Sequence, residues 1–159
     1  MRIVNTIVIH CSATREDFNY SFADCIRDHK SRGFRKCGYH FYITKDGTIH
    51  IGRLLSEVGA HVGKEFNRNS IGICYEGGIK AKGNPSNPKD AADTRTPAQK
   101  KAIIKCIEES LAYGQGKITS IVGHRDLSPD LNGNGIIEPK EWIKSCPCFD
   151  AEPEYKYLL

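Results

Sequence analysis

The sequence predicts a single α/β domain with a mixed central β-sheet flanked by helices. Strand-like and helix-like segments alternate along the chain, which is the pattern of this fold class. Two apolar segments each end in a histidine, as strands do at the ligand-binding edge of an open α/β sheet. A length of 159 residues suits one core of ordinary size, so residues 1–159 are expected to form one domain.

The first elements are a strand and a helix. Residues 5–10 form an apolar run that ends at His10, which predicts the opening strand. Residues 22–32 place apolar side chains on one side and charged ones on the other, which predicts a helix. Gly33 then occupies the position at which a glycine commonly ends a helix.

A β-hairpin is predicted next. Residues 39–44 and 49–53 are rich in aromatic and β-branched side chains, and Asp46-Gly47 lies between them. Asp-Gly between two such runs is a strong short-range signal for a hairpin.

The second half of the chain repeats the alternation. Residues 70–75 predict a strand, and the polar residues 79–95 predict a surface loop rather than a domain boundary. A helix is expected from Thr96 to Tyr113, because Thr96-Pro97-Ala98-Gln99 has the residues of a capping box with proline in the first turn. A strand at 118–123 leads to His124, and a short helix is expected at 139–145.

Composition narrows the function classes. The chain has 39% apolar residues and a mean hydropathy of -0.46, with a formal charge of +4 and a pI near 8.6. The mild basicity favours an anionic polymer as partner, but basic residues are not clustered or interleaved with aromatic ones, so we expect no nucleic-acid partner. We expect no membrane span, and we expect a monomer.

The cysteines and the first residues indicate the compartment. The odd number of cysteines argues against a disulfide framework and favours synthesis in a reducing cytoplasm. The seven positions are Cys11, Cys25, Cys37, Cys74, Cys106, Cys146 and Cys148. We recognise no signal peptide, so an action outside the cytoplasm would require lysis or non-classical export.

The two strand-end histidines suggest a metal site. His10 and His124, with a thiolate from Cys146, would give zinc three ligands and leave one position open, as in catalytic zinc sites. Cys148 is a rival for the thiolate position, and Cys11 is adjacent to His10. Taken singly, each histidine is more commonly a hydrogen-bonded polar residue at a strand terminus than a metal ligand.

Motifs in register along the chain resemble the zinc-dependent N-acetylmuramoyl-L-alanine amidases of the second type. This fold includes the amidase-type phage lysozymes and the peptidoglycan recognition proteins. The segments that carry the resemblance are Ile9-His10-Cys11-Ser12-Ala13-Thr14, Gly38-Tyr39-His40-Phe41, Asp46-Gly47-Thr48, Gly52-Arg53, Val58-Gly59-Ala60-His61, Asn69-Ser70-Ile71-Gly72-Ile73, Thr96-Pro97-Ala98-Gln99, Gly123-His124-Arg125-Asp126 and Lys144-Ser145-Cys146-Pro147.

The resemblance implies roles for particular residues. It places the zinc ligands at His10, His124 and Cys146, because the ligand cysteine of the family directly precedes a proline. It matches Tyr39 and Lys144 to the catalytic tyrosine and lysine of the phage lysozymes. His61 matches a histidine that lines the family's substrate groove, and peptidoglycan is the implied partner.

Residues 130–141 fit a second metal-binding pattern. The segment follows the spacing of an EF-hand calcium loop, with glycine at position six and glutamate at position twelve. The expected ligands of a structural calcium ion are Asp130, Asn132, Asn134, Ile136 through its carbonyl, Glu138 and Glu141. The loop is an insertion relative to the phage lysozymes, whose connection between the ligand histidine and cysteine is much shorter. An Asn-Gly-rich turn without an ion is the alternative.

The function that these observations predict is zinc-dependent hydrolysis of the amide bond between N-acetylmuramic acid and L-alanine. A phage or prophage endolysin and a secreted antibacterial effector both fit. The main alternative is a non-catalytic peptidoglycan-binding recognition protein, although Lys144 and Cys146 favour catalysis. A regulatory role toward a protein partner and cleavage of a different bond by the same site are further alternatives.

Overall fold

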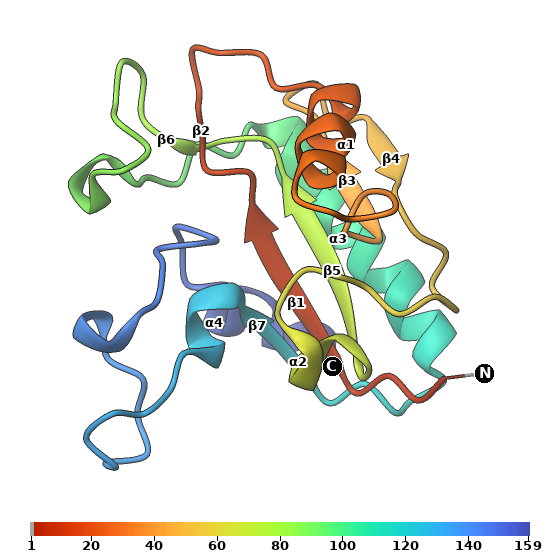
Figure 1. Ribbon diagram of the computed structural model, residues 1–159. Coiled ribbons are helices and arrows are strands. Elements are labelled where there is room, and N and C mark those ends of the chain that lie inside the picture. Colours follow the sequence, from red (N-terminus) through yellow and green to blue (C-terminus); the bar gives the residue numbers. More distant parts are fainter. Residues whose placement is uncertain (1) are drawn as a thin grey trace.

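The central sheet of this protein has five strands in the order β4-β3-β5-β1-β7 (Figure 1). The computed structural model describes residues 2–159. The strands are β1 (Thr6–Cys11), β3 (Phe41–Ile43), β4 (Ile49–Ile51), β5 (Ser70–Tyr75) and β7 (Ser120–Gly123). Only β4 is antiparallel to its neighbour, so the sheet is mixed, as the sequence predicts.

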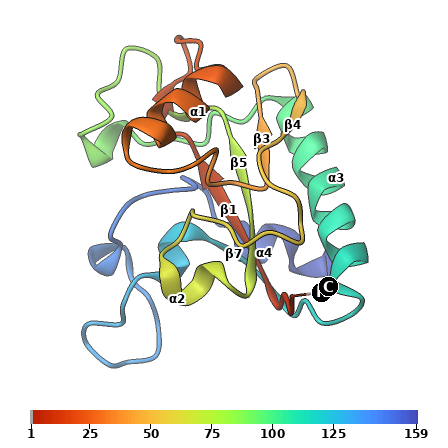
Figure 2. The same ribbon diagram turned by 45° about the vertical axis from the view of Figure 1, so that its right-hand side comes forward.

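Helices cover both faces of the sheet (Figure 2). They are α1 (Phe22–Ser31), the one-turn α2 (Lys64–Asn67), α3 (Pro97–Gly114) and α4 (Ala151–Tyr155). One face packs isoleucines of β1 and β5 against Ile103 and Ile107 of α3. The other face packs Tyr42 and Cys74 against Cys25 of α1. Because both faces are covered, every residue of β5 is buried.

The local signals for the helices are confirmed. Thr96 and Gln99 form a reciprocal capping box at the start of α3. Ser21 and Asp24 form another box at the start of α1, and Gly33 follows that helix with a φ of 88°. The Asp46-Gly47 turn joins β3 and β4 into the expected hairpin.

Neither α2 nor α4 was predicted, and three further parts of the fold differ from the predictions. A small second sheet pairs β2 (Thr14–Arg15) with β6 (Gly78–Ile79). The expected helix at 139–145 is only a 3-10 turn at Pro139–Glu141, since the chain is extended again at Trp142. Short 3-10 turns also occur at Pro88–Asp90, His124–Leu127 and Lys156–Leu158, the last directly after α4.

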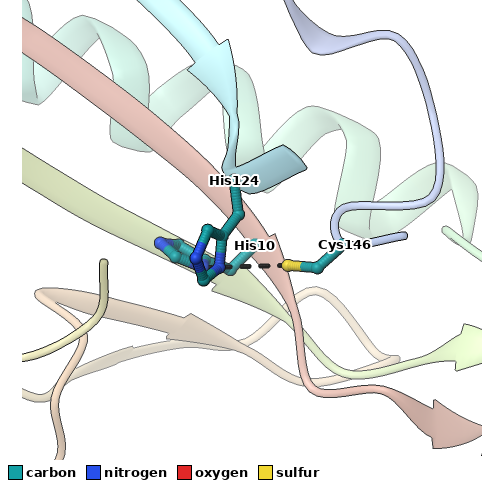
Figure 3. A group of neighbouring side chains, drawn as sticks. All are labelled: His10, His124 and Cys146. Carbon is teal, nitrogen blue, oxygen red and sulfur yellow. Dashed lines mark hydrogen bonds between the residues drawn. The ribbon is translucent and has the colours of Figure 1, made fainter. Parts of the chain in front are cut away.

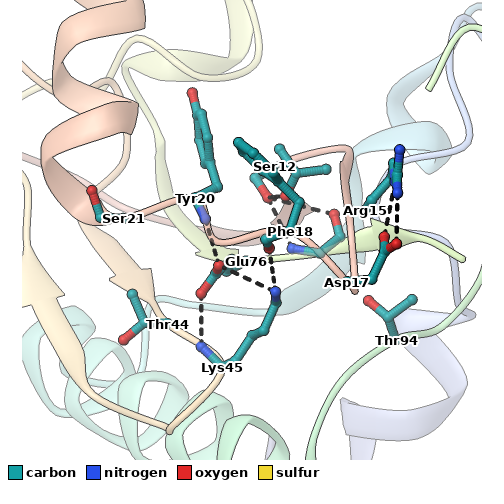
Figure 4. A network of polar contacts seen from close by, with 12 residues as sticks. Ser12, Arg15, Asp17, Phe18, Tyr20, Ser21, Thr44, Lys45, Glu76 and Thr94 are labelled. Carbon is teal, nitrogen blue, oxygen red and sulfur yellow. Dashed lines mark hydrogen bonds and ion pairs between the residues drawn. The ribbon is translucent and has the colours of Figure 1, made fainter. Parts of the chain in front are cut away.

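A buried glutamate fixes the carboxyl edge of the sheet (Figure 4). Glu76 directly follows β5 and is 4% exposed. Its carboxylate accepts hydrogen bonds from the backbone N–H groups of Tyr20 and Lys45, at 2.7 Å and 2.9 Å, and it pairs with the Lys45 ammonium at 3.6 Å. The entry to α1 and the hairpin turn are therefore tied to the same strand end.

Within residues 2–159, no helix is both long enough and apolar enough to traverse a lipid bilayer.

Candidate metal centre and active site

Strand pairing brings two histidines together at the carboxyl edge of the sheet. β1 and β7 run parallel and in register, with Ile9 opposite Gly123, so His10 and His124 leave the sheet side by side. Cys146 joins them from the C-terminal segment, where the Arg125 N–H donates to the Cys146 carbonyl at 2.8 Å. One ligand atom of each of the three residues lies within 4.8 Å of the other two (Figure 3).

The donor set fits zinc. The Cys146 Sγ lies 3.7 Å from the His10 Nδ1. Tetrahedral zinc with bonds of about 2.3 Å to sulfur and about 2.0 Å to nitrogen would hold the two donor atoms about 3.5 Å apart. The backbone N–H of Cys11 also donates a hydrogen bond to this sulfur, at 3.3 Å. Two imidazoles and one thiolate leave a fourth position for water or substrate.

Both histidines are held in their neutral form. Burial lowers the pKa of His10 well below its usual value, and the nearby His61, His124 and Lys144 lower it further. Burial and the Lys144 charge lower the pKa of His124 to about 4. Neutral imidazole is the form that binds a metal ion, so both histidines are suited to bind a metal ion at neutral pH.

The rival cysteine lies apart from the histidines. Cys148 is half-buried, and its Sγ lies 3.7 Å from the Sγ of Cys11. The cluster of ligand atoms contains Cys146 and not Cys148.

An open cleft of about 760 Å³ lies over the three candidate ligands. Tyr39, His61 and Lys144 also line it, so the structure brings every sequence-predicted residue of the active site to one cavity. A neighbouring cavity of about 520 Å³ shares Lys144 and Cys146 with the cleft and extends to Trp142. The two cavities are therefore adjacent at these two residues.

Tyr39 and Lys144 contribute a hydroxyl and an amino group to the residues that line this cleft. The ring of Tyr39 lies 5.1 Å from that of His10, and burial raises the pKa of its hydroxyl, which therefore stays protonated. Lys144 is exposed, and within residues 2–159 its ammonium has no salt-bridge or hydrogen-bond partner. Both groups can therefore act as hydrogen-bond donors to a bound substrate.

His61 has a contact that the sequence did not indicate. It lines the cleft, but its Nδ1 also lies 2.9 Å from the Nε2 of His10. A second Cys/His cluster was missed as well, formed by Cys25, His29 and Cys37. The spacing of Cys25 and His29 by four residues on a predicted helix was a usable signal, whereas no sequence pattern connects Cys37 with them.

The 130–141 loop is ordered by its own side chains. Asp130 accepts hydrogen bonds from the backbone N–H groups of Gly133 and Gly135, each at 2.7 Å. Glu141 is 4% exposed and accepts from the backbone N–H groups of Leu131 and Glu138, both at 2.9 Å. The polar side chains of the loop thus turn inward, and Glu141 joins its two ends.

The fold and the site define a class: an α/β domain with a mixed sheet, whose open cleft contains a His/His/Cys cluster that could hold a metal ion. The sequence matches the family described as N-acetylmuramoyl-L-alanine amidase over residues 1–141, and the chain belongs to that family. Lys144 and Cys146 lie just beyond the matched segment.

Individual relatives agree with this assignment. The chain is 35% identical over 146 residues to an endolysin of Klebsiella phage KP32, covering 92% of this chain and 82% of that protein. An uncharacterized protein of Haemophilus influenzae is 49% identical over 106 residues, which are 67% of this chain and 84% of that protein.

Solved structures show the same fold. The N-acetylmuramoyl-L-alanine amidase LysC from Clostridium intestinale URNW superposes with a TM-score of 0.68 at 27% identity, covering 98% of this chain and 83% of that one. Bumblebee PGRP-SA superposes with a TM-score of 0.69 at 20% identity, covering 98% and 82%, and supports the fold alone.

Proposed function

We propose that this chain hydrolyses the amide bond between N-acetylmuramic acid and L-alanine in peptidoglycan, using zinc held by His10, His124 and Cys146. Family membership supports the reaction and the substrate. The convergence of the three ligand atoms within 4.8 Å, beneath an open cleft, is the observation that supports the metal. The endolysin relatives favour action on the bacterial wall after lysis or export.

The reaction adds water to the amide carbonyl carbon and breaks its bond to the alanine nitrogen. The products are the lactyl carboxylate of the sugar and a stem peptide with a free amino group. Bound in this site, zinc would polarise the carbonyl and lower the pKa of a water molecule. The residues of the chain must then orient the substrate, stabilise the charge that forms on the oxygen and deliver a proton to the leaving nitrogen.

We assign the last two tasks to Lys144 and Tyr39, which both line the cleft. The free ammonium of Lys144 can donate a hydrogen bond to the carbonyl oxygen as negative charge develops there. The protonated hydroxyl of Tyr39 can orient the attacking water or pass a proton toward the leaving amine.

The direct test is digestion of purified peptidoglycan by metal-free protein, with and without added zinc, followed by mass spectrometry of the released fragments. We expect zinc-dependent release of stem peptides that begin with L-alanine. Protein that binds intact peptidoglycan but releases no fragment would support a non-catalytic recognition protein instead. Fragments cut elsewhere would show that the site acts on a different bond.

We further propose that residues 130–141 bind a structural calcium ion. The inward-facing oxygens of Asp130, Asn132 and Asn134 and the buried Glu141 support this proposal. Those oxygens accept backbone hydrogen bonds within the loop, so calcium would have to share or replace these contacts. Because the loop lies between His124 and Cys146, its order affects where the third zinc ligand sits.

The calcium proposal predicts a calcium-dependent stability. Metal-free protein should gain about 2.7 kcal/mol of unfolding free energy at a calcium concentration 100 times its dissociation constant. Glu141→Gln should remove most of this gain, because it removes the charge that joins the loop ends. The measurement is the melting temperature during titration with calcium alone. A melting temperature that ignores calcium in the unmodified protein would refute the proposal.

A further inference from the structure

We infer that His61 is a positioning residue for the metal centre: with Ser70 behind it, His61 holds His10 in the tautomer that presents a bare Nδ1 to the metal. This inference rests on the proposed zinc site. It goes beyond that proposal because it assigns a role to two residues that are not metal ligands.

A chain of hydrogen bonds fixes the direction of every proton. The Ser70 hydroxyl lies 2.8 Å from the carbonyl oxygen of Phe66, which can only accept, so the hydroxyl hydrogen is used there. The Ser70 oxygen, 3.3 Å from the His61 Nε2, must then accept a hydrogen from that nitrogen. A neutral His61 therefore has no hydrogen on Nδ1 and accepts one from the His10 Nε2 at 2.9 Å. His10 is left with a free lone pair on Nδ1, the nitrogen that faces Cys146.

The sheet leaves space for the His61 ring. A side-chain carbon at Gly72 would lie 2.7 Å from the Cγ of His61, and one at Gly59 would lie 2.5 Å from its Cδ2. Gly72 lies opposite Val8 in the register of β5 and β1, two residues from His10. Ser70 and Gly72 face the same side of β5, because side chains alternate along a strand. The missing side chain at Gly72 thus provides the space, and Ser70 provides the acceptor.

The segment that carries His61 is anchored separately. The side-chain oxygen of Asn67 accepts hydrogen bonds from the backbone N–H groups of His61 and Val62, both at 3.0 Å. Asn67 is the last residue of α2 and is itself buried. The backbone of His61 is therefore anchored by Asn67, and its ring fits against Gly59 and Gly72. Both ring nitrogens have hydrogen-bond partners.

This arrangement meets a general requirement of metal sites. A histidine ligand commonly donates its second ring N–H to a fixed acceptor, which sets its tautomer and orientation. Carboxylates and carbonyls are common acceptors, whereas here the acceptor is a neutral imidazole whose own proton is committed to Ser70. Loss of such a partner typically weakens metal binding by about 10- to 100-fold.

The test is the zinc dissociation constant of metal-free protein, measured by competition with a chromophoric chelator. His61→Leu keeps much of the ring volume but offers no acceptor, and should weaken zinc binding by about 10- to 100-fold. His61→Asn places an amide oxygen near the position of Nδ1 and should restore most of the affinity. Gly72→Ala should weaken zinc binding in the same direction, because the new methyl group displaces the His61 ring.

Each alternative has a distinct outcome. Thermal unfolding of the metal-free variants identifies any that fail to fold. If His61→Leu does not fold, the single variants Gly72→Ala and Ser70→Ala replace it in the zinc-binding test. The inference is wrong if folded His61→Leu binds zinc as tightly as the unmodified protein. It is also wrong if His61→Leu and His61→Asn weaken zinc binding equally. If the unmodified protein binds no zinc, or Cys146→Ser binds it equally well, the proposed zinc site has failed instead.

Discussion

Within residues 2–159, two clusters combine cysteine and histidine, and the hydrogen bonds of their histidines differ. His10, His124 and Cys146 meet at the edge of the sheet, and Cys25, His29 and Cys37 meet between α1 and the start of β3. In each cluster one ligand atom per residue lies within 4.8 Å of the others. Distance alone therefore does not distinguish them.

The difference lies at the second nitrogen of the histidine. In the edge cluster, His10 donates from Nε2 to His61 and leaves Nδ1 bare. In the other cluster, the backbone N–H of Gly38 donates to the His29 Nδ1 at 2.8 Å. A neutral His29 must then carry its hydrogen on Nε2, the nitrogen that lies 4.0 Å from the Cys25 Sγ.

A protonated ring nitrogen is a donor and not a ligand. His29 therefore serves the thiols as a hydrogen-bond donor, and the hydrogen bonds from Cys25 and His29 lower the pKa of Cys37. The contrast teaches that a remote hydrogen bond decides what a Cys/His cluster can bind.

The largest effect should come from exchanging one thiol in each cluster. Cys146→Ser should lose bound zinc and about a thousandfold in activity, since metal polarisation is worth several kcal/mol, here taken as about 4. Cys37→Ser, the matched control, should retain one zinc per chain. Elemental analysis and the peptidoglycan assay measure both. If Cys146→Ser retains zinc, Cys148 becomes the candidate for the thiolate ligand. If Cys37→Ser loses zinc, the contrast drawn between the two clusters is wrong.

The fold was predictable where signals are local. The capping box of Thr96 and Gln99 and the Asp46-Gly47 turn lie within a few residues of sequence, and both formed as expected. α4 was not predicted, because its five residues are held by distant partners. Arg95 reaches Glu154 at 2.8 Å and the Tyr155 hydroxyl at 2.6 Å, contacts that no local pattern reveals.

The residues of the candidate site could be predicted from the sequence, but not all of the contacts between them. Strand ends placed His10 and His124 together, because parallel neighbours share one edge. The contact between His61 and His10 depends on empty space above Gly59 and Gly72. A sequence shows that these residues are glycines, but not which ring fills the space they leave.

His40 is a third buried histidine, and both of its nitrogens bond to the backbone. Nδ1 accepts from the Gly72 N–H, and Nε2 lies 3.0 Å from the Glu57 carbonyl. Burial, with the charges of Arg2 and Arg53, lowers its pKa to about 4. The unfolded chain, with a pKa near 6.5, binds this proton more readily, so unfolding free energy falls as pH drops from about 6.5 to about 4.

The loss attributable to His40 is about 3 kcal/mol, from a pKa difference of about 2.5. His40→Asn keeps an acceptor for Gly72 but does not titrate, so its stability should fall less steeply over this pH range. Urea unfolding of metal-free protein at a series of pH values measures both slopes. Equal slopes would mean that His40 titrates in the folded protein as it does in the unfolded chain.

The smallest effect tests the donor role of His29 directly. His29→Leu removes the acceptor of the buried Gly38 N–H, which should cost about 1–3 kcal/mol of unfolding free energy. His29→Asn can present an oxygen to the same N–H and should recover part of that loss. Both variants should still bind one zinc per chain, because neither touches the edge cluster. A stoichiometry that falls from two zinc ions to one in His29→Leu would show that the buried cluster binds metal after all, and that the Gly38 hydrogen bond gives way to it.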